Sequence, residues 1–368
     1  MEKNQKKLVF FMPSMEGGGV EKNLIIIANY VSKYIECVSL ITFDDNFNRY
    51  FNKKIDIINV TSNSKKKSKY FKYLSCLCLL FKEYILNKNI LIFTFQANIY
   101  GIIFAYFFNI KIITRSNSSL SGWNKNFFKN YIYNFFIKKA NSVVVNSKEF
   151  QKEFKKKFKI NANLIYNPLN KNEIIRKSKS NKKNPYFFLK NTKLKIINIA
   201  RLTDQKDHLT LIKALSLMIN KLNFKLLIIG YGSNKAQLQK KIIDYKLNKH
   251  IKIIDNRHNP YTYLRDSDLF VLSSKFEGLP NVLLEAQTLK KYVISTSCPT
   301  GPKEILMHGK LGSLFKVGDY KKLASIILDF SKNKKKYQKS IDLAYKKLNR
   351  FDYELNCKKY LMLIKKYI

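Results

Sequence analysis

Two long stretches of the chain alternate short apolar runs with longer segments of helical spacing, and this alternation constrains the fold most strongly. In the first stretch, the apolar runs are residues 8–12, 37–42, 55–60, 90–95, 110–114, 142–145 and 162–166. In the second stretch they are residues 195–200, 225–229, 251–254, 269–272 and 292–295. Strands that alternate with helices in this way predict a parallel sheet covered on both faces. We therefore expect an α/β fold with two Rossmann-like halves, in which ligands bind at the carboxyl ends of the strands.

The length of 368 residues also favours two domains rather than one core. We expect an N-terminal domain at residues 1–170 and a C-terminal domain at residues 195–350. The segment between them, 171–194, contains the polar, basic stretch 177–185 and is the predicted linker. Residues 351–368 have the pattern of an amphipathic helix, which we expect to pack back toward the N-terminal domain.

One apolar segment, residues 90–113, could be mistaken for a membrane span, because Lys111 is its only charge. Polar residues such as Gln96 and Asn109 interrupt it, so a strand, a helix and a second strand are the preferred interpretation. The apolar run at the N-terminus is too short for a signal peptide.

The net charge of +44 reflects 69 Lys and Arg against 25 Asp and Glu. A chain rich in Lys, Asn, Ile, Phe and Tyr also fits an AT-rich genome, so the excess can be compositional. Physically, such a surface attracts anionic lipid or nucleic acid. The 5 cysteines lack Cys-x-x-Cys spacing, so a reducing cytoplasm fits better than a disulfide framework, and neither they nor the 4 histidines suggest a metal site.

Two glutamates, Glu277 and Glu285, bracket a turn that leads from an apolar run directly into a helix. Gly278 gives the turn backbone freedom, and Pro280 suits the first helical position. The N–H groups at the start of this helix, from Asn281 and Val282, predict a phosphate site. A phosphate flanked by two carboxylates suits a ligand with hydroxyls at both ends, such as a nucleotide sugar.

Two further loops follow strands. Arg201 and Lys206 follow the run at 195–200 and could both reach one diphosphate, although a solvated loop before a capped helix is the alternative. Glycines after the first run permit close approach of a ligand but do not form a dinucleotide motif; they are Gly17, Gly18 and Gly19.

These loops together resemble those of the retaining nucleotide-sugar glycosyltransferases of family 4, which have the GT-B fold of two Rossmann-like domains facing each other across a cleft. The resemblance is strongest over residues 195–330, which include the stretch 298–305, and extends to the stretches 18–21, 145–147 and 166–168. The stretch 298–305 looks most like that of enzymes that build bacterial surface glycans and lipid-linked glycans.

The resemblance implies a role for each motif. Arg201 and Lys206 would bind the donor diphosphate, Glu285 the ribose, and Glu277 the transferred sugar. The glycines at 17–19 would close over the phosphates. The resemblance also implies that the turn and the start of its helix contact the donor phosphate, through Gly278, Leu279, Asn281 and Val282. A further loop, with Asn256 and His258, would lie near the nucleotide base.

All four histidines lie in the second half of the chain, whereas many relatives place one near the acceptor in the first domain. Arg115 and Asn117 occupy the corresponding neighbourhood and are the candidates near the sugar or acceptor. The alternative for Arg115 is an ion pair at a strand end. Because the leaving phosphate can itself take the acceptor proton, the missing histidine does not exclude retention.

The sequence thus predicts a glycosyltransferase that moves a hexose or N-acetylhexosamine from a UDP-sugar to a growing, lipid-linked glycan, without a metal or other cofactor. We expect it in the cytoplasm, on the anionic inner face of the plasma membrane. Residues 123–139 combine aromatics with lysines, which fits an interfacial helix or a core-facing one. The alternatives are a UDP-sugar epimerase of the same fold and, from the charge alone, a nucleic-acid-binding protein. No nucleic-acid-binding motif supports the latter.

Overall fold

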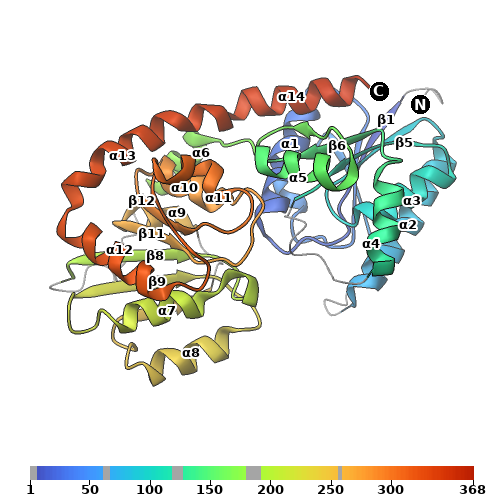
Figure 1. Ribbon diagram of the computed structural model, residues 1–368. Helices are drawn as coiled ribbons and strands as arrows, with labels where there is room; N and C mark the ends of the chain where they lie inside the picture. The colour runs from blue at the N-terminus through green and yellow to red at the C-terminus, as the bar shows by residue number, and fades with distance from the viewer. Residues whose placement is uncertain (1–5, 61–66, 118–126, 180–191, 256–258) are drawn as a thin grey trace. The chain divides into compact units, whose positions relative to one another are not determined.

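The computed structural model describes residues 6–60, 67–117, 127–179, 192–255 and 259–368. They form two compact α/β units (Figure 1). The first unit contains the chain up to Pro168 and also Tyr353–Ile368, and the second unit is Leu169–Asp352.

The first unit contains a parallel sheet in the order β3-β2-β1-β4-β5-β6-β7. Along the central first strand, successive side chains point to opposite faces of the sheet. Leu8 and Phe10 therefore belong to one hydrophobic core, and Val9 and Phe11 belong to another. The strands are β1 (Lys7–Phe11), β2 (Val38–Thr42), β3 (Ile55–Asn59), β4 (Ile90–Thr94), β5 (Lys111–Arg115), β6 (Ser142–Val145) and β7 (Asn163–Leu164).

Helices cover both faces of this sheet. Leu24 of α1 and Tyr360 of α14 are buried with Phe10, whereas Cys76 of α2 and Phe154 of α5 are buried on the other face. The helices are α1 (Gly19–Val31), the short η1 (Asn48–Tyr50), α2 (Lys69–Leu86), α3 (Asn98–Phe107), α4 (Phe127–Ile137), α5 (Lys148–Phe158) and α14 (Tyr353–Lys365).

The apolar segment at residues 90–113 is β4, α3 and the start of β5, as predicted from its polar interruptions. Within the described ranges, none of the helices has the length and apolar character needed to cross a membrane.

The second unit contains a parallel sheet in the order β10-β9-β8-β11-β12-β13. Its strands are β8 (Leu194–Ile199), β9 (Phe224–Ile229), β10 (Ile251–Ile254), β11 (Leu269–Leu272), β12 (Tyr292–Thr296) and β13 (Ser313–Phe315). Its helices are α6 (Lys171–Ser178), η4 (Asp204–Lys206), α7 (His208–Ser216), α8 (Lys235–Asp244), α9 (Pro260–Arg265), α10 (Asn281–Thr288), α11 (Pro302–Ile305), η5 (Met307–Gly309), α12 (Tyr320–Lys332), α13 (Lys334–Lys347) and η6 (Leu348–Phe351).

The start of the predicted linker differs from the expectation, because it forms α6 within the second unit. The Asn170 side chain caps this helix by accepting from the Glu173 N–H at 3.0 Å. Ile174 is only 3% exposed, and α6 packs against α9. The segment was predicted to be a linker because its composition is polar and basic, although its one buried isoleucine, Ile174, anchors the helix.

Strand order determines which loops of the second unit can meet. β8 and β11 are neighbours, with Ile196 paired to Leu269 and Ile197 to Phe270. Because both strands run in the same direction, the loops that follow them emerge side by side at the carboxyl edge of the sheet.

Candidate functional site

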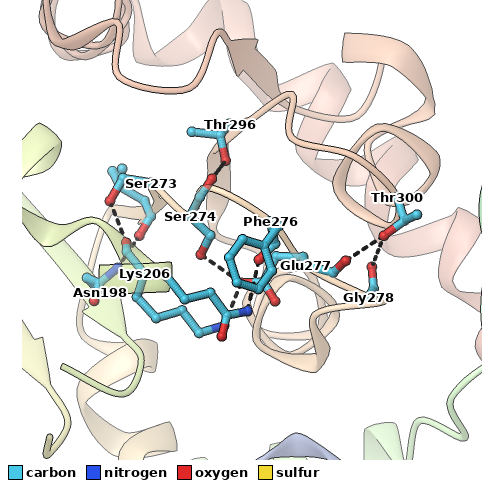
Figure 2. Close-up of polar contacts among 11 residues, drawn as sticks. Asn198, Lys206, Ser273, Ser274, Phe276, Glu277, Gly278, Thr296 and Thr300 are labelled. Carbon is cyan, nitrogen blue, oxygen red and sulfur yellow. Dashed lines mark hydrogen bonds and ion pairs between the residues drawn. The ribbon is translucent and has the colours of Figure 1, made fainter. Parts of the chain in front are cut away.

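The loops after β8 and β11 are joined by side-chain hydrogen bonds (Figure 2). Ser273 Oγ donates to the backbone carbonyl of Asp207 at 2.8 Å and is 3.2 Å from that of Lys206. Gln205 Nε2 donates to the carbonyl of Phe276 at 2.9 Å. These bonds fix the two loops relative to each other, so side chains from both can form one site.

At the junction of these loops, Lys206 and Glu277 form an ion pair with Nζ 2.5 Å from Oε1 (Figure 2). The side chains are only 14% and 7% exposed, respectively. Ser274 Oγ donates to the same carboxylate oxygen at 2.6 Å. Glu277 is therefore held as an oriented carboxylate beside a cation.

A third segment fixes the backbone around Glu277. Thr300 Oγ1 donates to the carbonyl of Glu277 at 2.5 Å and lies 3.4 Å from that of Gly278 (Figure 2). Gly301, with φ +50°, approaches so closely that an added Cβ would lie 1.8 Å from the Gly278 carbonyl oxygen. Only glycine fits this position, which explains the glycine in the Pro-Thr-Gly-Pro stretch.

The site continues into α10. This helix begins at Asn281, so Pro280 is its N-cap (φ −72°) rather than the first helical residue that the sequence predicted. Gly278 and Leu279 are buried immediately before it, and Val282 is partly exposed in its first turn. Glu285 lies one turn further along α10 and is 5% exposed. The positive end of the helix dipole therefore faces the region between the two glutamates.

Arg201 is exposed at the carboxyl end of β8, on the same loop as Lys206. The next residue is anchored, because the Leu202 N–H donates to the Tyr231 carbonyl at 2.7 Å. The structure thus places both predicted diphosphate ligands at one sheet edge. The predicted base contacts Asn256 and His258 lie outside the described residues.

Two ionisable groups near the pair have altered pKa values. Burial, followed by the positive charge of Lys206, lowers the pKa of His208 to about 4. Burial, followed by the negative charge of Glu277, raises the pKa of the Cys298 thiol to about 12. Both groups are consequently neutral near pH 7, so neither adds charge to the site.

The glycine loop belongs to the first unit. Gly17 has φ +80°, Gly18 is the N-cap of α1, and Gly19 begins that helix. The Glu21 carboxylate folds back and accepts from the Glu16 N–H at 3.1 Å, which orders the loop. Gly17 and Gly19 are exposed, so their backbone is accessible to a ligand.

Arg115 has a different environment from the predicted one. It is 0% exposed in the first unit, where Nε donates to Tyr360 Oη at 2.9 Å and Nη2 to Asn167 Oδ1 at 2.6 Å. Nη1 donates to Asn117 Oδ1, and Asn117 in turn donates to the Phe95 carbonyl at 2.7 Å. The guanidinium is thus committed to neutral oxygen acceptors rather than to the ion pair weighed as the alternative.

Asp266 and Asp268 have the Asp-x-Asp spacing of a metal-binding motif, but both precede a buried strand and accept hydrogen bonds from the chain itself. Asp266 accepts from Arg265 Nε at 2.8 Å, and Asp268 accepts from the Lys195 N–H at 2.8 Å. In the described ranges, no group of three or more His, Cys, Asp or Glu side chains is arranged to hold a metal ion.

Sequence reasoning missed Ser274 and Thr300 as members of the site. Both stand in motifs that the resemblance included, the first directly after β11 and the second in the stretch before α11. Their position after strands of one parallel sheet was the available signal, because such residues gather at one edge.

A sheet edge that combines cations for a diphosphate with an oriented carboxylate for a hydroxyl suits an enzyme that acts on nucleotide sugars. In a chain with two Rossmann-like units, these features define a glycosyltransferase of the GT-B class.

Comparison with known proteins supports this class. Residues 176–347 match the family Glycosyl transferases group 1. A Campylobacter jejuni relative, N-acetylgalactosamine-N,N'-diacetylbacillosaminyl-diphospho-undecaprenol 4-alpha-N-acetylgalactosaminyltransferase, is 24% identical over 97% of this chain and 100% of its own. An uncharacterized glycosyltransferase of Methanocaldococcus jannaschii is 35% identical, over 47% of this chain and only 44% of its own length.

Among solved structures, HepE from Anabaena in complex with UDP and glucose has the same fold. Its TM-score is 0.80 at 19% identity, over 98% of this chain and 100% of that one. This likeness confirms the predicted fold class, and the match over residues 176–347 together with the relatives named as glycosyltransferases confirms the predicted enzyme class.

Proposed function

We propose that this protein is a retaining glycosyltransferase of family 4 that transfers a hexose or N-acetylhexosamine from a UDP-sugar to a growing, lipid-linked bacterial glycan. The observation that carries the proposal is the Lys206–Glu277 pair, 2.5 Å apart at the start of α10. One member suits the leaving diphosphate and the other a sugar hydroxyl, so the pair would hold the two ends of the breaking bond.

The charges in the site match those that develop during transfer. Departure of UDP leaves negative charge on the diphosphate, and the sugar becomes cationic as the bond to phosphate breaks. Lys206 Nζ has three donors, so it can bind a phosphate oxygen while it keeps Glu277. Arg201, on the same loop, can add a planar fork of donors.

Glu277 is proposed as a sugar-binding residue rather than as a general base. Oε1 already accepts from both Lys206 and Ser274, so the carboxylate has a fixed direction. A carboxylate offers about four lone-pair sites and can accept from a sugar hydroxyl in addition. Glu285, further along α10, is proposed to accept from the ribose hydroxyls.

The relatives support the choice of substrates. HepE was crystallised with UDP and glucose, which supports a UDP-sugar donor. The name of the Campylobacter relative contains a diphospho-undecaprenol acceptor, which supports a lipid-linked acceptor and a place at the inner face of the plasma membrane. The proposal includes no metal and no other cofactor, because Lys206 and Arg201 can supply the countercharge that a metal ion would provide.

The test is an assay of UDP release with a panel of UDP-sugars, with and without short-chain polyprenyl-diphosphate-linked saccharides. We expect release to require both substrates, and NMR of the product to show the anomeric configuration of the donor. Inversion of that configuration would contradict the retaining mechanism. Conversion of the UDP-sugar into an isomer without an acceptor would instead identify an epimerase.

A further inference from the structure

Helix α2 of the first unit has an apolar face that no described part of the chain covers. Phe71, Leu74, Phe81 and Ile85 are 45%, 63%, 42% and 56% exposed, and together with Cys78 they repeat at intervals of three and four residues. This spacing places them in one stripe along the helix. The stripe is distinct from the residues of α2 that cover the sheet, since Cys76 and Leu80 are completely buried.

The neighbouring helices α3 and α4 extend this stripe. At the end of α3, Tyr106 is 48% and Phe107 is 72% exposed, and on α4 Tyr131 is 65% and Phe135 is 48% exposed. The three helices lie side by side on one flank of the first unit (Figure 1).

Ring contacts make the exposed surface continuous. The Phe81 ring of α2 lies 5.5 Å from that of Phe108, which follows α3. The Tyr106 ring of α3 lies 5.9 Å from that of Phe136 on α4. We call this surface the α2–α4 face; its exposed apolar residues are Phe71, Leu74, Phe81, Ile85, Phe107 and Phe135.

Lysines border the α2–α4 face. Lys82 and Lys138 are exposed on it, and the Lys88 and Lys139 ammonium groups lie 4.2 Å from the Tyr84 ring centre and 5.2 Å from that of Phe135. In residues 67–117 and 130–140, Glu83 is the sole acidic side chain, and Lys7 neutralises it at 2.7 Å. Asp44, from the loop after β2, pairs with Lys72 of α2 at 2.7 Å. The surface is therefore apolar and carries more positive than negative charge.

This combination fits a lipid surface better than a protein partner. Lysine is depleted in protein–protein interfaces, whereas lysines can extend to lipid headgroups while their stems cover apolar surface. Aromatic side chains are enriched at the same level of a bilayer. Anionic lipids would supply the charge that the face lacks.

We propose that the α2–α4 face binds the surface of an anionic phospholipid bilayer. This inference rests on the proposed membrane location and identifies the part of the molecule that makes the contact. Helix α4 serves both of the roles that the sequence left open, because Ile137 is buried in the core while Tyr131 and Phe135 face outward.

The first test is flotation with phosphatidylcholine vesicles that contain or lack phosphatidylglycerol, in the absence of donor and acceptor. We expect the wild-type protein to float with the anionic vesicles at low salt, and Leu74→Glu/Phe81→Glu/Ile85→Glu to remain at the bottom. The matched control is Leu217→Glu/Ile243→Glu/Leu343→Glu in the second unit, whose native side chains are 43%, 67% and 41% exposed. The control should float like the wild type.

The charge contribution is tested separately. Lys82→Gln/Lys138→Gln should lower the vesicle partition coefficient by about fivefold per lysine, because each basic residue near an anionic surface contributes about that factor. Lys240→Gln/Lys310→Gln, two exposed lysines of the second unit, should have no effect.

Three results would overturn the proposal. The first is flotation of the triple glutamate variant at the wild-type level, and the second is no binding of the wild type to anionic vesicles. The third is a wild-type dimer in light scattering that the triple variant dissociates, which would assign the face to a second copy. Transfer to a water-soluble acceptor is measured in parallel, so that loss of the proposed activity and loss of membrane binding are separate outcomes.

Discussion

Lys206 and Glu277 lie 71 positions apart in the chain, yet Nζ and Oε1 are in contact at 2.5 Å. The pair is nearly buried, so each charge is stabilised mainly by the opposite charge of its partner rather than by water. Removal of one partner leaves an uncompensated charge in a poorly hydrated place, whereas removal of both does not. A loss of activity in a single variant would therefore mix a chemical effect with a folding effect.

We predict that the double variant Lys206→Met/Glu277→Gln separates these effects. Lys206→Met alone should lower the free energy of unfolding by roughly 2–4 kcal/mol, the cost of an unpaired buried charge reduced for partial exposure. The double variant should recover most of that loss. Both variants should nevertheless transfer sugar about 10²–10³-fold more slowly, because the charge on the leaving diphosphate is no longer neutralised. Urea unfolding and transfer rates measure the two quantities, and near-normal turnover by the double variant would refute the assigned roles.

We also predict that two glycines with positive φ differ in their importance for the site. Gly301→Ala forces the new Cβ against the Gly278 carbonyl, 1.8 Å away, whereas Gly309→Ala (φ +98°) meets nothing within 4 Å. Gly309→Ala should lose about 1–2 kcal/mol of stability from backbone strain, and Gly301→Ala should lose more, because the clash adds to the same strain. Gly301→Ala alone should also weaken UDP binding, by about tenfold or more, because it displaces the turn before α10. Calorimetric titration with UDP checks this difference, and equal affinities would show that the close approach has no functional consequence.

Buried His208 predicts a pH dependence of stability. Its pKa is about 4 in the folded protein and 6.5 without burial, so the unfolded chain binds a proton first as the pH falls. Its stabilisation is complete above pH 6.5 and is lost progressively toward pH 4. At about 1.36 kcal/mol per pKa unit, the loss approaches 3 kcal/mol. His208→Leu should remove this component from the pH profile of thermal unfolding, whereas His308→Asn, at an exposed histidine, should leave it unchanged. Parallel profiles for wild type and His208→Leu would rule out the effect.

Local pattern was sufficient for every strand of both sheets except the short edge strand β13, and for the nature of the segment at residues 90–113. Polar interruptions and strand length can be read directly from the sequence. It was insufficient for α2. Apolar residues occur all around that helix, so periodicity alone could not show that Cys76 and Leu80 are buried while Leu74 and Phe81 face outward. Which side of α2 is buried depends on the sheet, because the sheet can cover only one side of the helix.

The sequence by itself determined the class of fold and indicated the motifs and charged residues of the candidate site, because each of these depends on a short stretch of chain. Only the tertiary structure decided which of these residues touch. It paired Lys206 with Glu277 because β8 and β11 are neighbours. It also enclosed Arg115 among Tyr360, Asn117 and Asn167, because the last helix returns to the first sheet. Contacts between residues far apart in the chain depend on strand order and helix packing, and neither is a property of a local sequence pattern.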